Sequence, residues 1–210
     1  MKQKFTQTNC LTKLKMISVF LFIGLLVISF SVQAQGTKQY AVTDIAILKA
    51  DLILPAGSGN PDIFELTTSG GAYVLSGTLA PVKSITIKAA AGLAAKPILS
   101  MSNASSNSTN AFFKPTLANL VFHFEGLELN GLNGGAGPSQ SVFLQTLSAL
   151  GTANNQVFIL NCYAHDFLNT AGNGFIRHDG NGCSIDIQGS TFNNCGGRMF
   201  YFNPTLTTPA

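Results

Sequence analysis

Short stretches along the chain alternate between apolar and polar residues. In residues 85–88 (Ile-Thr-Ile-Lys), 122–125 (Phe-His-Phe-Glu) and 185–188 (Ile-Asp-Ile-Gln), every second side chain is apolar, and residues 157–160 (Val-Phe-Ile-Leu) are apolar throughout. Alternation of this kind is typical of a strand that buries one face. We therefore predict four equivalent strands at these places.

The four stretches recur at solenoid-like spacing. If Ile87, Phe124, Leu160 and Ile187 are equivalent, they lie 37, 36 and 27 residues apart. Two residues further on, each repeat has a small residue suited to a tight corner: Ala89, Gly126, Cys162 and Gly189. Six residues further on, three repeats have a residue that tolerates turn geometry: Asn130, Asp166 and Asn193.

A second strand is expected after each first strand. We place these strands at residues 97–101, 141–146, 174–179 and 198–203, and we place an earlier rung at residues 62–66 and 72–75. The fold class predicted is all-β: a right-handed parallel β-helix of about five rungs, with the handedness taken from the general preference of parallel crossovers. A short capping helix over residues 43–54 is expected to cover the open edge of the first rung.

The first 34 residues follow the pattern of a secretory signal peptide. Four lysines precede the apolar run 16–30, and Val32-Gln33-Ala34 provides a small-residue cleavage site. The alternative is a membrane anchor, because the run approaches the length of a spanning helix. We predict a signal peptide at 1–34, an N-terminal cap at 35–61, a β-helix at 62–203 and a tail at 204–210, in a protein that is secreted, periplasmic or on the cell surface.

The charge of the mature chain bears on nucleic-acid binding, and its cysteines bear on disulfide formation and metal binding. Removal of residues 1–34 leaves eight basic and nine acidic residues, so the mature chain lacks the basicity typical of a nucleic-acid-binding protein. Cys162, Cys183 and Cys195 would remain in an oxidising compartment, where at most one internal disulfide could form; the alternative is three buried apolar side chains. Their spacing matches no zinc motif, and we assign no metal ligand.

Several segments resemble the pectate-lyase-like right-handed β-helices, and within that superfamily they are most similar to exported bacterial β-helix domains of unknown function. These segments are residues 69–77, 83–88, 124–129, 160–163 and 187–192. The resemblance implies a polysaccharide partner, often an acidic one. In lyase members it also implies Ca²⁺-assisted β-elimination, which needs carboxylates for the ion and a basic residue for the proton.

No such catalytic set is evident in the sequence. We therefore assign no catalytic residue and no cofactor, and Ca²⁺ is expected only if the chain is a lyase. The main functional hypothesis is glycan association, either as a non-catalytic recognition protein or as a surface-protein module. The alternative is a polysaccharide lyase.

The candidate ligand-binding residues are Arg177, His178, Asp179 and Arg198. They cluster on the second strands, where two arginines on adjacent rungs would suit an anionic chain. The alternative is that these charges lie at strand ends in contact with water.

Other polar and aromatic residues allow two interpretations. His165 and Asp166 are a base and its orienting group in one interpretation and a turn in the other, which we favour. Lys88 and Glu125 are expected to form an ion pair between rungs. Tyr163 and Tyr201 are the better candidates for a sugar platform, although packing is the favoured role. Because an apolar strand precedes the tail, we expect further C-terminal rungs, a capping domain or another chain at that end.

Overall fold

The computed structural model describes residues 36–57, 59–102, 111–132, 142–167, 174–195 and 198–203. The predicted signal peptide and the tail at 204–210 lie outside these ranges. Within the ranges, no helix has both the length and the apolar character needed to cross a membrane.

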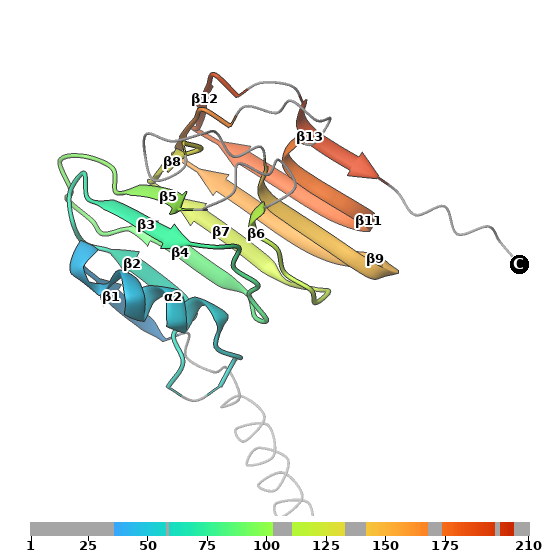
Figure 1. Cartoon of the computed structure of the whole chain (residues 1–210), viewed down its shortest axis with the longest axis horizontal. Coiled ribbons are helices and arrows are strands. Elements are labelled where there is room, and N and C mark those ends of the chain that lie inside the picture. The colour runs from blue at the N-terminus through green and yellow to red at the C-terminus, as the bar shows by residue number, and fades with distance from the viewer. Residues whose placement is uncertain are drawn as a thin grey trace, which may run out of the picture. The chain divides into compact units, whose positions relative to one another are not determined.

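The strands of the described residues form two sheets, and every strand pairing in them is parallel. The larger sheet contains, in spatial order, β1 (Thr37–Tyr40), β2 (Ile63–Leu66), β4 (Ile85–Ala89), β7 (Val121–Glu125), β9 (Val142–Leu160), β11 (Gly174–Gln188) and β13 (Arg198–Asn203), with β6 (Ala111–Phe113) also paired to β9. The smaller sheet contains β12 (Thr191–Asn193), β10 (Tyr163–His165), β8 (Glu128–Asn130), β5 (Ile98–Ser102) and β3 (Ala72–Ser76). Figure 1 shows both rows of strands. The prediction of an all-β chain with parallel strands is confirmed.

The chain passes back and forth between the two sheets. It runs from β2 to β3, then to β4 beside β2, and then to β5 beside β3. The strands β9 and β11 are long, and each has two separately paired parts: the first part of β9 pairs with β6, and its last part pairs with β7. The predicted second strands therefore do not form one set. Residues 97–101 form most of β5, which pairs with β3 and β8, whereas residues 141–146 contain the start of β9.

The predicted register is wrong by one residue in the third repeat. Phe124 pairs with Ile159 and not with Leu160, and Ile159 pairs with Ile187. Because residues 157–160 are all apolar, their pattern does not show which of them face inward. The corner residue of this repeat is therefore Asn161 and not Cys162. Asn161 has φ 52°, and the corner glycines Gly126 and Gly189 have φ 69° and 58°.

The interior contains a column of aromatic side chains. The Phe143 ring lies 4.8 Å from that of Phe124 and 5.2 Å from that of Phe175, measured between ring centroids. All three side chains are almost fully buried. Phe143 and Phe175 lie on the paired strands β9 and β11, whereas Phe124 is aligned with Ile159 and contacts Phe143 in the interior. The rings together remove a continuous apolar surface from water.

The N-terminal end has the predicted helix and a strand that was not predicted. A 3₁₀ turn (η2, Val42–Asp44) leads into α2 (Ile45–Ile53), which buries Leu48 and Leu52 and packs against β3. The strand β1 extends the larger sheet beyond β2. The helix predicted at residues 43–54 is thus confirmed, and it covers the edge of the smaller sheet.

A buried polar network joins β1 to α2. The Tyr40 hydroxyl and the Lys38 ammonium each donate to Asp51 Oδ2 over 2.7 Å. Burial, together with the hydrogen bond to Asp51, raises the pKa of Tyr40. Burial also acts to raise the pKa of Asp51, but the hydrogen bonds from Lys38 and Tyr40 outweigh it, so this pKa lies below its usual value.

The aromatic column predicts a large loss of stability when one of its rings is removed. Phe124→Ala is expected to lower the free energy of unfolding by roughly 3–5 kcal/mol, because a buried ring would be replaced by a cavity. The control is Leu117→Ala, at a side chain that is 46% exposed, with an expected change within about 0.5 kcal/mol. Urea unfolding measures both variants, and similar losses for the two would contradict the packing described.

Candidate functional site

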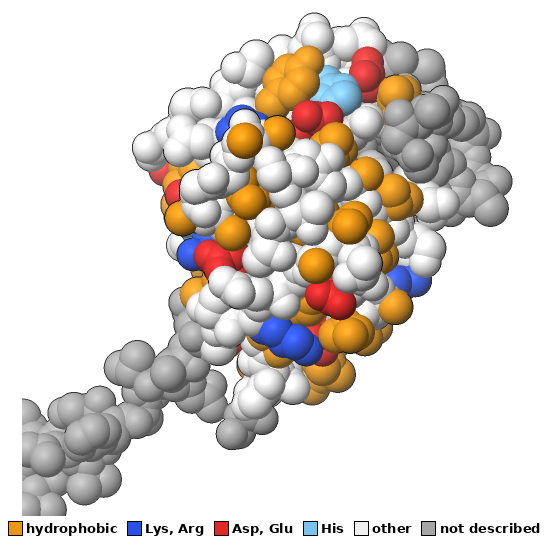
Figure 2. Space-filling model, turned by 90° about the vertical axis from the view of Figure 1, so that its left-hand side faces the viewer, with side chains coloured by type: hydrophobic (Ala, Val, Ile, Leu, Met, Phe, Trp, Pro, Cys, Tyr) orange, Lys and Arg blue, Asp and Glu red, His pale blue; other side chains and the backbone are white. Residues whose placement is uncertain are grey.

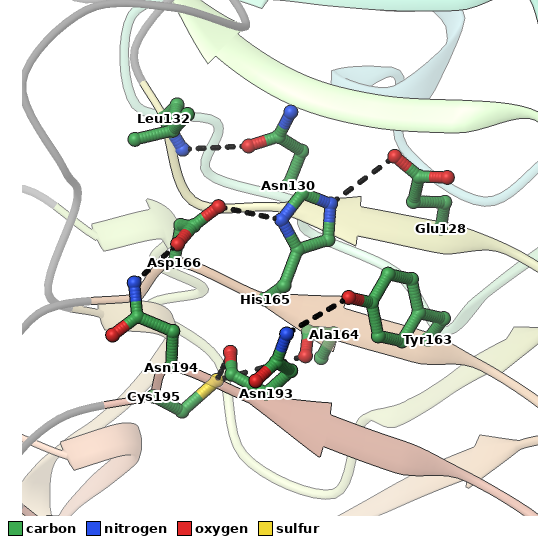
Figure 3. A network of polar contacts seen from close by, with 10 residues as sticks. All are labelled: Glu128, Asn130, Leu132, Tyr163, Ala164, His165, Asp166, Asn193, Asn194 and Cys195. Atoms are coloured by element: carbon green, nitrogen blue, oxygen red, sulfur yellow. Dashed lines mark hydrogen bonds and ion pairs between the residues drawn. The ribbon is translucent and has the colours of Figure 1, made fainter.

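A polar cluster lies on the outward side of β8, β10 and β12. In the registered strands, Tyr163 lies between Glu128 and Thr191, and His165 lies between Asn130 and Asn193. Ala164 and Leu129 are buried between these positions, so the alternation directs Tyr163 and His165 outward. Figure 3 shows the cluster from close by, and Figure 2 shows a histidine on the surface with acidic side chains beside it.

His165 is held by two carboxylates from different parts of the chain. Its Nδ1 lies 2.8 Å from Asp166 Oδ2, and its Nε2 lies 3.1 Å from Glu128 Oε1 (Figure 3). Glu128 belongs to the neighbouring strand β8, whereas Asp166 directly follows β10. Each ring nitrogen thus faces a carboxylate oxygen, an arrangement that fixes the ring and does not direct a basic nitrogen toward a substrate.

Asp166 shapes the turn after β10. It adopts φ 61°, in the left-handed region that Asp and Asn tolerate. Its Oδ1 accepts a hydrogen bond from Asn194 Nδ2 at 2.5 Å. Hydrogen bonds from His165 and then from Asn194 lower the pKa of Asp166. The turn function predicted for Asp166 is therefore confirmed, and the same residue also orients His165.

Tyr163 provides a flat aromatic surface beside this charged group. Its ring stacks on that of His165, with the centroids 4.9 Å apart and the planes 21° from parallel. Its hydroxyl accepts a hydrogen bond from Asn193 Nδ2 over 3.2 Å. Both side chains are partly exposed. Aromatic, amide and carboxylate groups thus occupy one continuous patch, which we call the β10 patch: Glu128, Tyr163, His165, Asp166, Asn193 and Asn194.

Of the residues predicted to bind a ligand, the structure brings Arg177 and Asp179 together and turns His178 away from them. Arg177 and Asp179 of β11 form an ion pair, with 2.8 Å between Nε and Oδ2, and the Arg177 guanidinium lies 5.5 Å from the centroid of the Tyr201 ring. His178 is 2% exposed and contacts Thr146 Oγ1 through Nδ1 at 2.5 Å, so it lies in the interior and not on the outward face assumed for it.

The two arginines are not aligned on adjacent strands. The register of β11 with β13 pairs Arg177 with Tyr201, and it pairs Arg198 with Gly174. Of Arg198 the structure describes the backbone. Arg177 therefore has an aromatic neighbour on the next strand in place of the second cation that the sequence suggested.

The ion pair predicted on the first strands has a different partner. Lys88 is aligned with both Glu125 and Glu65, and its Nζ forms the ion pair with Glu65, 3.4 Å from Oε1. Glu125 lies near His123, with 3.7 Å between Oε2 and Nε2. Among the described residues, no group of three or more His, Cys, Asp and Glu side chains is placed to hold a metal ion.

The three cysteines of the described region carry free thiols. Cys162 is buried, and Cys183 and Cys195 are partly buried against the core. Burial raises the pKa of Cys162 and Cys195 and raises that of Cys183 to about 11. Their environment matches the alternative of apolar packing, and their raised pKa values disfavour reactive thiolates.

Glu128 and Asn194 belong to the cluster but were not among the sequence candidates. A usable signal was present for Glu128, because it lies between Leu127 and Leu129, which are both apolar and both buried. That alternation directs Glu128 outward. The sequence did not show that His165 lies on the strand beside Glu128, because the one-residue error in the third repeat aligned Asn130 with Asp166 and not with His165.

No known protein-family model matches this chain, and no curated protein matches it.

The contacts of Asp166 predict a pH-dependent stability. Because its pKa is lowered on folding, its contribution is fully present above the unfolded-state pKa near 4 and is lost as the pH falls through the lower folded value. Asp166→Asn keeps the turn but removes the charge, and it should cost about 1 kcal/mol at neutral pH. The difference from the parent should shrink toward about pH 3 in urea unfolding.

The matched control for this variant is Asp186→Asn. The Asp186 carboxylate accepts hydrogen bonds from the uncharged Gln188, and its loss should change the stability by less than about 0.5 kcal/mol. A cost for Asp166→Asn that is equally small, or that does not vary with pH, would contradict the role assigned to the carboxylate.

Proposed function

We propose that this chain is a non-catalytic polysaccharide-recognition protein and that the β10 patch is its binding surface. The observation that carries the proposal is the aromatic stack of Tyr163 on His165 beside amide and carboxylate groups. A sugar ring has an apolar face of C–H groups and an edge of hydroxyls. An exposed aromatic ring suits the face, and the amides and carboxylates suit the hydroxyls.

The proposal includes a fold more specific than two parallel sheets. We propose a right-handed parallel β-helix of about five rungs, supported by the alternation of the chain between the sheets from β2 to β5 and from β7 to β13, and by the preferred hand of parallel crossovers. In such a helix, β8, β10 and β12 are successive steps about 4.8 Å apart. Their outward side chains would then form a strip along the helix axis, suited to an extended polymer.

The contacts of His165 and Arg177 support binding of a polysaccharide better than its cleavage by a lyase. Both ring nitrogens of His165 face carboxylates, and Arg177 forms an ion pair with Asp179. A group that removes a proton from a substrate needs access to that proton. The lyase alternative stays a prediction, and formation of unsaturated uronate product from pectate with Ca²⁺ would establish it.

A second surface should be tested in the same experiments. Arg177 and Tyr201 combine a cation with an aromatic ring, which would suit an acidic glycan. This surface retains two residues from the sequence prediction, Arg177 and Asp179. Asp179 offsets the charge of Arg177, which is why the β10 patch is preferred here.

Export would bring either surface into contact with extracellular polysaccharide. The predicted signal peptide at residues 1–34 supports this localisation. Mass spectrometry of the exported protein would test it, with an N-terminus at Gln35 expected and an uncleaved N-terminus contradicting it.

Binding is expected to depend on Tyr163. In affinity electrophoresis against soluble neutral and acidic polysaccharides, Tyr163→Ala should weaken retention at least tenfold, equivalent to about 1.4 kcal/mol. Tyr201→Ala removes an identical side chain from the other surface and is the matched control, with unchanged retention expected.

The outcomes separate the two surfaces. Loss of binding in Tyr201→Ala or Arg177→Ala with Tyr163→Ala unaffected would move the site to the β11 and β13 surface. Absence of binding to every polysaccharide tested would overturn the proposed function.

A further inference from the structure

The β10 patch contains more negative than positive charge. Glu128 and Asp166 supply two carboxylates, and the ring of His165 lies between them, with one ring nitrogen on each (Figure 3). A histidine carries at most one positive charge, so at neutral pH the three side chains are net negative in either protonation state of the ring. The carboxylate side chains of Glu128 and Asp166 are 27% and 25% exposed, so a ligand on the patch would meet their charge.

The strands on either side add no cation to these rows of side chains. In register with Glu128 and Tyr163 lie Ile98 and Thr191, and in register with His165 lie Ser100, Asn130 and Asn193. None of these neighbours is a lysine or an arginine. Lys96 precedes β5 and lies outside these rows, and its ammonium donates to the carbonyl of Asn161 at the corner before β10. The described rows therefore offer a bound sugar hydroxyl, amide and carboxylate groups.

The stacking of Tyr163 determines where a sugar would meet this charge. His165 covers one face of the Tyr163 ring, so a sugar can stack only on the other face. Glu128 is aligned with Tyr163 on the adjacent strand, one strand spacing of about 4.8 Å away. A sugar on the exposed face of the ring would therefore lie close to the Glu128 carboxylate.

Hydroxyl and carboxylate groups on the sugar would interact with Glu128 in opposite ways. A carboxylate oxygen only accepts hydrogen bonds, so a sugar hydroxyl can donate to it. An ionised uronate has no proton to donate from its carboxylate, and it adds a like charge at short range. The local chemistry thus favours a sugar without a charge.

We infer that the β10 patch binds uncharged polysaccharides and excludes those built from uronates, with Glu128 and Asp166 as the residues that determine this specificity. The inference rests on the binding surface proposed above and adds the class of ligand. It differs from the expectation drawn from the sequence resemblance, which implied a partner that is often acidic.

A galacturonan with and without its charge tests the inference. Methyl esterification of homogalacturonan removes the charge of each uronate and keeps the sugar backbone. The neutral probes are this ester, a β-glucan and a galactomannan, and the acidic probes are polygalacturonate and alginate. In calorimetric titration at neutral pH and low salt, the best neutral probe should bind roughly tenfold more tightly than either acidic probe.

Removal of one charge should increase the affinity for acidic probes. Glu128→Gln keeps a hydrogen-bond acceptor toward His165 and removes the repulsion, so the affinity for polygalacturonate should rise by a factor of roughly three or more. A gain of affinity cannot result from unfolding. If Glu128→Gln does not fold, Asp166→Asn provides the same test from the other side of His165.

The matched control is Glu65→Gln. Glu65 lies on β2 of the larger sheet, and its replacement changes the net charge of the chain by the same amount. The ratio of neutral to acidic affinity should stay as in the parent. This comparison separates the charge of the patch from that of the whole chain.

Salt provides a measurement without any variant. Because salt screens repulsion between exposed charges, an increase from about 20 to about 200 mM NaCl should strengthen acidic binding relative to neutral binding.

Two results would overturn the inference and leave the proposed surface in place. One is acidic binding that is as tight as neutral binding and is lost in Tyr163→Ala. The other is a ratio of neutral to acidic affinity that Glu128→Gln and Asp166→Asn change no more than Glu65→Gln does. Absence of binding to every probe would overturn the proposed function together with the inference.

Discussion

The structure depends on the stacking of inward side chains from one parallel strand to the next. Ile87, Phe124 and Ile159 are aligned on β4, β7 and β9, and the Phe143 ring packs against Phe124 and stacks on Phe175. Because side chains alternate between the two sides of a strand, an inward position fixes its neighbours as outward. The β10 patch is a consequence: burial of Leu129 and Ala164 directs Glu128, Tyr163 and His165 to the outer surface.

Charged side chains in the described region largely form ion pairs with one another. Lys38 pairs with Asp51, Lys88 with Glu65 and Arg177 with Asp179. In a chain of which 10% of the residues are charged, these pairs leave little unbalanced charge to attract an acidic polymer. Recognition through an aromatic face and hydrogen bonds therefore accords with this charge distribution better than electrostatic attraction does.

Strands with clear alternation were predictable from the sequence. Residues 85–88, 122–125 and 185–188 all lie in strands of the larger sheet, and Ile87 pairs with Phe124 as expected. The pattern failed where both neighbours are apolar. Residues 157–160 gave the wrong register, and because Phe175 and Ile176 are both buried, the sequence did not reveal that His178 faces inward.

The strands that position the candidate site could not be predicted from periodicity. The strands β8, β10 and β12 have three residues each, too few to show a repeat of two. Three members of the patch were identified from their chemistry: His165 and Asp166 were assigned to a turn, and Tyr163 was assigned to packing. Contact with Glu128 arises from strand pairing across 37 positions of sequence, which local patterns do not encode.

The chain's three histidines allow a direct test of the central claim, that the outer surface of β10 is the recognition site. His165 lies in the patch, His123 on the larger sheet and His178 in the interior. The measurement is imidazole NMR of the protein during titration with an oligosaccharide that it binds. The account predicts that the His165 resonances shift with saturation while those of His123 and His178 stay in place. Saturable binding that shifts His123 or His178 and leaves His165 unchanged would contradict it.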